Sequence, residues 1–244
     1  VLHDGMTITV DAFTGMVYEG AVDIGLGAVV SSGSAGNVTS DSGGSCDSTI
    51  TATEIKVVLD LPYRAKAAAD TGADGIGLVR SEIIIAQGGI HPAEYLRTGR
   101  ENDFVKLLKD GIREMAQAFN PRPIWIRTSD MRSDEYRNLT GGDKEPHESD
   151  PMIGWHGIRR HLDEKNLLKA EFRALKELHD EGLKNVGVMI PFVIRASEVA
   201  EAKAVMREVG LEPCRDIEFG IMCETPASCW IMEEICREGI SFVS

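Results

Sequence analysis

The chain has 244 residues, 43% of them hydrophobic, which is enough to bury a sizeable core. Its 39 acidic and 26 basic residues give a formal charge of −13, which argues against a nucleic-acid surface and against binding to anionic membranes. No apolar run approaches the roughly 20 residues that span a bilayer, and no signal segment opens the chain. We therefore expect a cytoplasmic protein.

The five cysteines form no CxxC pair, and an odd number cannot close completely into disulfides within one chain. They are Cys46, Cys214, Cys223, Cys229 and Cys236. Because free cysteine is among the more buried residue types, we expect reduced and mostly buried thiols.

Composition divides the chain into three parts. Residues 1–24 contain two short strand-like runs, 6–10 and 16–18, around the turn residues Thr14-Gly15, which predicts a β-hairpin. Residues 25–53 are rich in Ser, Gly and Thr, a composition that buries too little apolar area to fold and is typical of a flexible linker. Residues 54–244 return to apolar periodicity and form the main predicted domain.

Strands and helices alternate along the main domain. We expect strands over 75–79, 124–127, 185–192, 218–223 and 240–244. The expected helices cover 54–71, interrupted by Pro62, about 94–119, about 165–181, 197–209 with Ser197 as N-cap, and 226–238. Between the strand over 124–127 and the helix over about 165–181 we expect a functional loop over 131–150. This alternation predicts a parallel sheet. Five or six strands are fewer than the eight of a closed barrel, so the expected fold class is α/β, a partial (β/α)8 barrel.

Charged residues follow three of the short apolar strands. Arg127 follows Ile124-Trp125-Ile126, Arg80 ends the strand over 75–79, and Glu224 follows the strand over 218–223. Because parallel strands present their carboxyl ends at one edge of a sheet, we expect these three side chains to converge. Two arginines and a carboxylate predict a site for an anionic ligand and a cation.

Five separated motifs then resemble one family. They occur in the order GADGIGLVRSE, RPIWIRTSDMRSDEYRNLTGG, DPMIGWHGIRRHL, NVGVMIPFV and EFGIMCETPAS. In order and spacing they resemble the phosphoenolpyruvate/pyruvate-binding barrel of the phosphoenolpyruvate-utilising enzymes, which include phosphoenolpyruvate synthase, pyruvate phosphate dikinase and enzyme I of the sugar phosphotransferase system. Residues 1–24 resemble the tail of the swivelling phosphohistidine domain that precedes this barrel in the family.

The resemblance implies that a phosphoryl group passes between a phosphohistidine and pyruvate, with Mg²⁺, to give phosphoenolpyruvate. It implies that Arg80 and Arg127 hold the phosphoryl group and the enolate oxygen, and that Glu224 is one of two carboxylate ligands of Mg²⁺. Guanidinium forks suit phosphate oxygens, and a hard cation prefers carboxylate oxygen.

Two departures from the family pattern affect this expectation. His156 stands where the family has a further phosphate-binding arginine, and Arg159 is a candidate substitute for it. The family's Gly-Thr-Asn-Asp segment, with the second metal carboxylate, and its catalytic cysteine would come after Ser244; neither Cys223 nor Cys229 is at the cysteine's position. We therefore keep an alternative open, that of a catalytically silent binding or assembly module. We also expect a homo-oligomer, or association through the open edge of the barrel.

Other motifs favour structural interpretations. We expect His91 on the surface, and His147 and His156 lack the paired spacing of a metal site. The Gly141-Gly142 pair with Lys144 is more typical of a turn than of a phosphate cradle. The tryptophans are expected in the core: Trp125, Trp155 and Trp230.

Overall fold

A computed structural model describes residues 3–11, 16–22 and 51–244, and contacts divide the chain into two compact units, Val1–Ile50 and Thr51–Ser244. The first unit contains a hairpin of β1 (Ile8–Asp11) and β2 (Met16–Glu19), which pair in antiparallel register. The predicted hairpin is therefore present. Its expected turn residues, and most of the expected linker over 25–53, lie outside the described residues.

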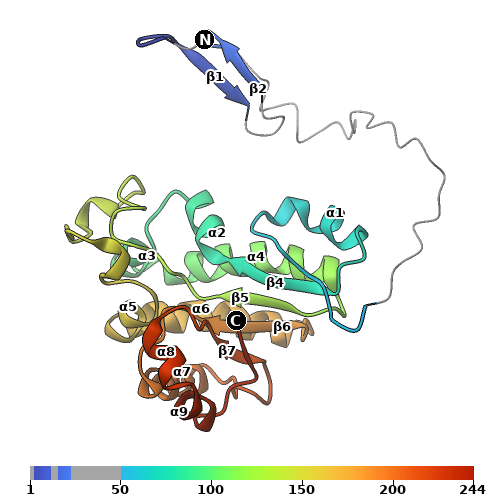
Figure 1. Ribbon diagram of the computed structural model, residues 1–244. Coiled ribbons are helices and arrows are strands. Elements are labelled where there is room, and N and C mark those ends of the chain that lie inside the picture. Colours follow the sequence, from blue (N-terminus) through green and yellow to red (C-terminus); the bar gives the residue numbers. More distant parts are fainter. Residues whose placement is uncertain (1–2, 12–15, 23–50) are drawn as a thin grey trace, which may run out of the picture. The chain divides into compact units, whose positions relative to one another are not determined.

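The second unit contains a parallel sheet whose strands lie side by side in chain order, curled into a half-barrel (Figure 1). The strands are β3 (Lys56–Val58), β4 (Gly75–Arg80), β5 (Ile124–Arg127), β6 (Val186–Ile190), β7 (Phe219–Ile221) and β8 (Phe242–Val243). Every residue of β6 is buried, as expected for a strand covered on both faces. The predicted α/β fold with a partial (β/α)8 barrel is confirmed.

Helices connect the strands, and neighbouring helices pack against one another (Figure 1). They are α1 (Ala65–Asp70), α2 (Ser81–Gln87), α3 (Pro92–Arg97), α4 (Glu101–Phe119), α5 (Gly157–Asp163), α6 (Lys165–Asp180), α7 (Ala196–Glu208), α8 (Pro226–Trp230) and α9 (Met232–Arg237), with short 3₁₀ turns η1 (Pro62–Arg64), η2 (Gly142–Lys144) and η3 (Pro151–Ile153). Apolar residues on one face of α4, such as Phe104, Leu108 and Met115, are fully buried. This packing fixes the strands whose carboxyl ends carry the charged residues.

The predicted helix over 54–71 is wrong in its first half. Residues 56–58 instead form β3, which pairs with β4 at one edge of the sheet. Val57 and Val58 are β-branched and suit a strand, and Pro62 begins η1 because a proline has no backbone N–H to donate within a helix. Only residues 65–70 are α-helical.

Other helix boundaries also differ from the prediction. The helix expected over about 94–119 is split into α3 and α4, because Gly99 adopts a left-handed φ of 71° after α3. Ser197 lies inside α7, whose N-cap is Arg195; the carboxylate of Glu198 accepts the backbone N–H of Arg195 at 3.1 Å. The helix expected over 226–238 is likewise two helices, α8 and α9.

The tryptophans and the cysteines are less buried than predicted. Trp125 and Trp155 are half-buried, and Trp230 is 88% exposed at the end of α8, rather than in the core. Of the cysteines in the described residues, Cys214, Cys229 and Cys236 are exposed and Cys223 is half-buried, so the thiols are not mostly buried. Cys46 lies outside the described residues. Residue type alone does not fix which side chains meet the sheet, so the burial of individual cysteines and tryptophans could not be predicted from it.

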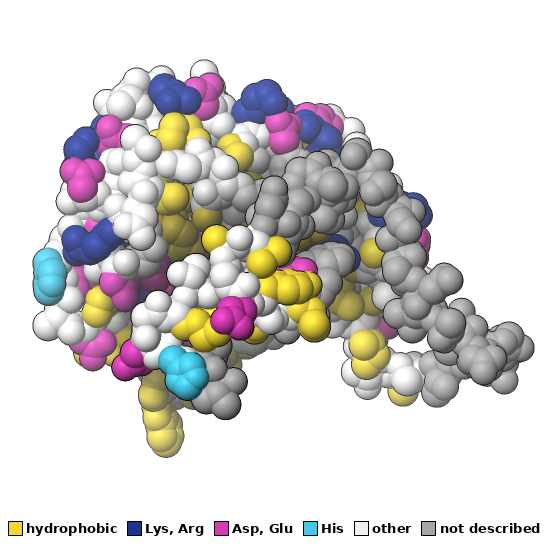
Figure 2. Space-filling view, turned by 90° about the horizontal axis from the view of Figure 1, so that it is seen from above, with side chains coloured by type: hydrophobic (Ala, Val, Ile, Leu, Met, Phe, Trp, Pro, Cys, Tyr) yellow, Lys and Arg dark blue, Asp and Glu magenta, His cyan; other side chains and the backbone are white. Residues whose placement is uncertain are grey.

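Opposite charges are interleaved on the surface. On the face shown in Figure 2, Lys and Arg side chains lie beside Asp and Glu side chains. Pairs along the helices include Lys66 with Asp70 and Lys176 with Asp180. No helix in the described part of the chain has the length and apolarity needed to cross a membrane.

Candidate functional site

A cavity of about 410 Å³ lies at the carboxyl ends of β4, β5 and β7. Its walls consist of Arg80, Glu82, Ile83, Arg127, Asp130, Arg132, Glu135, Tyr136, Met152, His156, Phe192 and Glu224. The structure therefore places Arg80, Arg127 and Glu224 around one cavity: Arg80 and Arg127 end β4 and β5, and Glu224 follows β7. His156 lines the same cavity, whereas Arg159 is not among its lining residues.

Arg127 and Glu82 form a buried ion pair in the cavity wall. Arg127 Nη2 donates to Glu82 Oε1 at 2.9 Å, and the backbone N–H of Asp130 donates to the same oxygen at 2.5 Å. Burial disfavours the charge on Arg127, but the carboxylates of Glu82 and Asp130 outweigh it and raise the pKa of Arg127. Burial raises the pKa of Glu82, although the guanidinium opposes that effect.

This pair leaves hydrogen-bonding groups unused. Arg127 Nε and Glu82 Oε2 are buried and have no hydrogen-bond partner within the residues that the structure describes. An unpartnered buried donor is costly unless a ligand or water completes it. Arg127 therefore places a positive charge in the cavity wall and keeps one guanidinium N–H without a partner.

Arg80 lies at the more open side of the cavity. It is the last residue of β4, and its guanidinium Nη1 donates to Asp60 Oδ2 at 2.7 Å. The backbone N–H of Arg80 donates to the other oxygen of the same carboxylate at 2.9 Å. Asp60 thus holds both the backbone N–H and the guanidinium of Arg80, while the side chain remains 46% exposed and accessible to a ligand.

Glu224 is held at the cavity by the backbone after β6. Its Oε1 accepts the backbone N–H of Phe192 at 2.7 Å. Phe192 has a left-handed φ of 60°, a conformation that costs a non-glycine residue about 1–3 kcal/mol and concentrates at functional sites. This hydrogen bond therefore holds both the left-handed turn at Phe192 and the Glu224 carboxylate in place beside the cavity.

His156 is committed to two acceptors. Its Nδ1 lies 2.6 Å from Asp130 Oδ1, and its Nε2 lies 2.8 Å from the backbone oxygen of Met152. Both partners can only accept, so both hydrogen bonds require the doubly protonated imidazolium. Burial disfavours this charge, but the Asp130 and Met152 hydrogen bonds prevail and raise the pKa of His156. The ring that makes both hydrogen bonds therefore carries a positive charge in the cavity wall.

Arg159 is also committed to backbone oxygens. Its Nη1 donates to the carbonyls of Ile153 at 2.9 Å and Gly154 at 2.6 Å. Its guanidinium carbon lies 5.6 Å from the centre of the Phe192 ring. Arg159 therefore lies next to Phe192, which lines the cavity, without lining the cavity itself.

A buried cluster behind β5 was missed by the sequence reasoning. Ser129 donates from its hydroxyl and its backbone N–H to the carboxylate of Glu171, at 2.5 and 2.9 Å. His161 Nε2 lies 3.2 Å from Ser129 Oγ and 3.1 Å from Glu171 Oε1. Both contacts use the same ring nitrogen, so the cluster does not relay a proton as a catalytic triad does. It instead anchors the chain two residues after Arg127.

His91 is buried, so the prediction of a surface histidine is wrong. Its Nδ1 accepts the backbone N–H of Ala93 at 3.2 Å, and its Nε2 lies 3.3 Å from Glu145 Oε1. Glu145 also accepts two hydrogen bonds from Arg160, at 2.7 and 2.8 Å. Burial lowers the pKa of His91 to about 4, against the pull of Glu145. No local pattern marks this contact, because Glu145 lies far along the chain.

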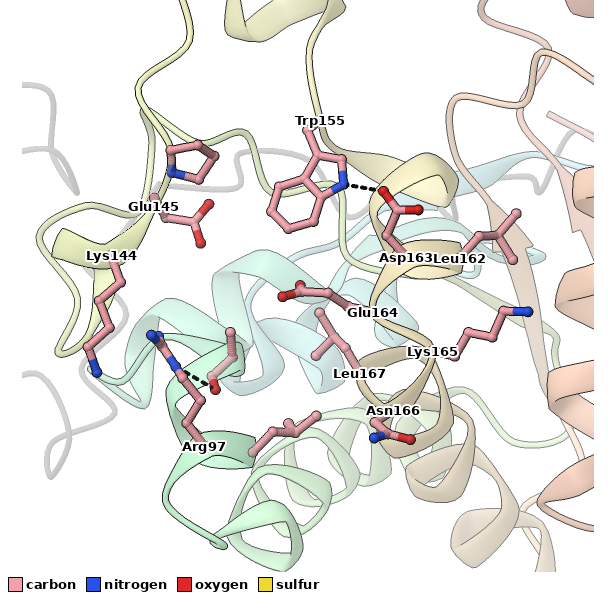
Figure 3. A pocket seen from close by; sticks show the side chains of 13 residues that line it. Arg97, Lys144, Glu145, Trp155, Leu162, Asp163, Glu164, Lys165, Asn166 and Leu167 are labelled. Atoms are coloured by element: carbon pink, nitrogen blue, oxygen red, sulfur yellow. Dashed lines mark hydrogen bonds between the residues drawn. The ribbon is translucent and has the colours of Figure 1, made fainter.

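A second cavity, of about 630 Å³, lies between α3, the loop before η3 and the start of α6 (Figure 3). Lys144 and Arg97 line it, and both pair with Glu94, at 2.8 and 3.0 Å. Trp155 Nε1 donates across it to Asp163 Oδ2 at 2.7 Å. Arg97, Lys144 and Asp163 are therefore already engaged by neighbouring side chains.

The Gly141-Gly142 pair beside this cavity is a tight turn. A Cβ added to Gly142 would lie 2.2 Å from the backbone oxygen of Tyr136, and Gly141 has a φ of 82°. The glycines are needed for close backbone packing, in agreement with the expected turn. The ammonium of Lys144 forms an ion pair with Glu94.

The candidate site can contribute one carboxylate at its edge to a cation. Within the residues described, no group of three or more His, Cys, Asp or Glu side chains could hold a metal ion. Mg²⁺ needs no such cage, because it usually takes one or two carboxylates together with water and substrate phosphate oxygens. Glu224 in a cavity with Arg80 and Arg127 fits that requirement.

Comparison with known proteins extends over the whole main unit. The family model described as "PEP-utilising enzyme, PEP-binding domain" matches residues 41–244. A probable phosphoenolpyruvate synthase of Methanothermobacter thermautotrophicus is 45% identical over 243 residues, which is 100% of this chain and 34% of the relative. A probable phosphoenolpyruvate synthase of Methanocaldococcus jannaschii is 48% identical over 244 residues, 100% of this chain and 20% of the relative.

A phosphoenolpyruvate synthase of Pyrococcus furiosus is 43% identical over 243 residues, 100% of this chain and 29% of the relative. The chain thus spans between a fifth and about a third of the length of these relatives.

Proposed function

The chain belongs to the family of the PEP-utilising enzymes, as their PEP-binding domain, and we propose from this that its cavity binds phosphoenolpyruvate or pyruvate together with Mg²⁺. The activity proposed for the whole protein is that of a phosphoenolpyruvate-forming phosphotransferase. In it, a phosphoryl group passes between a phosphohistidine and pyruvate. The proposal rests above all on one observation: Arg80 and Arg127, which end β4 and β5, and Glu224, which follows β7, line the same cavity.

Each side chain has a role that follows from its chemistry. Arg127 binds a phosphoryl oxygen with its unpartnered Nε–H, and Arg80 closes on the ligand from the open side. Glu224 would hold Mg²⁺, which would supply positive charge against the negative charge that develops during transfer. His156 and Arg159 add positive charge from the wall and from behind the turn at Phe192.

Titration calorimetry with phosphoenolpyruvate in the presence of Mg²⁺ tests this proposal. We expect measurable binding by the chain and its loss in Arg127→Ala, because the substitution removes the buried guanidinium. Arg237→Ala is the matched control, since Arg237 is 70% exposed and pairs with Glu233 on the surface of α9, away from the cavity lining. Equal binding by both variants would reject Arg127 as a ligand-binding residue.

The proposal also assigns the other parts of the chain. We propose that residues 1–24 belong to a phosphohistidine domain and residues 25–53 link it to the barrel over 54–244, in a cytoplasmic protein. Association through an outer strand, β3 or β8, is proposed as well, since Val58 and Val243 are 59% and 46% exposed on them. Sedimentation velocity at increasing protein concentration tests it, and a constant monomer would reject it.

The alternative is a binding or assembly module that carries out no transfer itself. Calorimetry separates ligand binding from turnover. Binding by the chain without formation of phosphoenolpyruvate from pyruvate and a phosphorylated histidine donor would favour the module.

A further inference from the structure

Two cysteines meet beside the candidate site. Cys223 Sγ and Cys229 Sγ lie 3.4 Å apart, and both thiols are free. Cys229 is exposed and Cys223 is half-buried, so a small oxidant can reach the pair. Cys214, another cysteine within the described residues, contacts the backbone oxygen of Gly239 instead of a second thiol.

The local fold holds the two sulfur atoms together. Cys223 follows β7, and Cys229 lies in α8, whose N-cap is Thr225. The Thr225 hydroxyl accepts the backbone N–H of Ser228 at 3.2 Å, and the hydroxyl of Ser228 donates back to the Thr225 carbonyl at 2.8 Å. These bonds close the turn tightly and keep Cys229 next to Cys223. The proximity is thus built into the start of α8.

We propose that Cys223 and Cys229 form a reversible modification site, which a hydroperoxide oxidises to a disulfide. The Cys229 thiol loses its proton and its sulfur attacks a peroxide oxygen; the O–O bond breaks, and the leaving hydroxide takes up that proton as water, which leaves a sulfenic acid on Cys229. The Cys223 thiol then attacks that sulfur, the S–S bond forms, the S–O bond breaks and water leaves. In total two thiols and one hydrogen peroxide give one disulfide and two waters, and the sulfur pair loses two electrons to the peroxide.

The required movement is small. A disulfide has an S–S distance of about 2.05 Å, so the sulfur atoms need to approach by only about 1.4 Å. The resulting link brackets Glu224, which lies between the two cysteines in the chain. The site would therefore connect the redox state of the surroundings to the turn that carries this carboxylate.

Peptide mapping after exposure to hydrogen peroxide tests the proposal directly. A protease specific for Glu places each of these cysteines on its own peptide: Cys223 on 219–224, Cys229 on 225–233 and Cys236 on 235–238. We expect peptides 219–224 and 225–233 to be joined, at a mass lower by two hydrogen atoms than their sum. Dithiothreitol should separate them again.

Two variants distinguish pairing from general oxidation. Cys229→Ser should abolish the joined peptide, while Cys236→Ser should form it at the wild-type rate, since Cys236 is also exposed but lies on α9. Oxidation of Cys223 and Cys229 separately to sulfinic acids, or pairing of Cys229 with Cys236 or with a second chain, would overturn the proposal. The readout requires no ligand, so it stands whether or not the cavity binds phosphoenolpyruvate.

Discussion

The guanidinium of Arg127 and the carboxylate of Glu82 meet at 2.9 Å in the wall of the candidate site, with both side chains largely buried. Glu82 also accepts the backbone N–H of Asp130, so one carboxylate fixes the arginine and the turn that follows it. The pair therefore links the stability of the domain to the geometry of the cavity. An anion entering the cavity meets an arginine whose position is already set.

Glu82→Ala should destabilise the domain strongly. Removing one partner of a buried ion pair leaves an uncompensated charge, and we expect a loss of about 3 kcal/mol or more in the free energy of unfolding. Urea denaturation measures it. Glu233→Ala breaks an exposed pair with Arg237 and should change stability by no more than about 0.5 kcal/mol. Similar losses in both variants would show that the buried pair carries no special weight.

The charge on His156 should stabilise the domain at low pH. Folding raises the pKa of His156 above its usual 6.5, so the folded state binds this proton more tightly than the unfolded state. The resulting stability is complete below the unfolded pKa and is lost as pH rises through the folded one. The stability difference between wild type and His156→Gln should therefore shrink as pH rises above the ordinary histidine pKa of 6.5. If the stability difference between wild type and His156→Gln grows with pH instead, the folded state does not hold His156 as an imidazolium.

His91 should behave in the opposite way. Folding lowers its pKa from 6.5 to about 4, so the folded state disfavours the proton. The neutral ring contributes its full stability above pH 6.5. As pH falls from 6.5 to about 4, on the order of 3 kcal/mol of the free energy of unfolding is lost. His91→Gln, which can keep both contacts without titrating, should lose less stability than wild type over the same range. An NMR titration of His91 near its ordinary pKa would refute this account.

Gly142→Ala should destabilise the turn before η3 because of backbone crowding. The added Cβ would lie 2.2 Å from the Tyr136 carbonyl oxygen, which cannot rotate away as a side chain can. We expect a cost of about 1–3 kcal/mol in thermal or urea unfolding. Asp143→Ala, at the exposed neighbouring position, should cost no more than about 0.5 kcal/mol. A neutral Gly142→Ala would mean that the loop accommodates the methyl group by shifting.

The inner strands were predictable from the sequence, since β5, β6 and β7 are short apolar runs, and β6 and β7 are buried on both faces. The edge strand β3 was not, because a strand of three residues lacks a periodic signal and its valines also fit a helix face. The convergence of Arg80, Arg127 and Glu224 followed from parallel strand order alone.

Contacts between distant segments could not be predicted. His91 meets Glu145, and Ser129 meets His161 and Glu171, only after the loops and helices have packed. The surface position of Trp230 depends on the end of α8 at that residue, which interrupts the longer helix that the sequence suggested.

The central claim is that Arg127 and Glu224 act on the same ligand. Arg127 binds it directly, and Glu224 holds the Mg²⁺ ion that accompanies it. The most direct test of this claim is the affinity of the chain for phosphoenolpyruvate, measured by calorimetry with and without Mg²⁺, in wild type and in Glu224→Gln. Glu224→Gln keeps an acceptor for the Phe192 N–H but removes the charge that binds the metal. We predict that Mg²⁺ strengthens binding at least about tenfold in wild type and has little effect in the variant. An equal Mg²⁺ effect in both proteins would contradict the account.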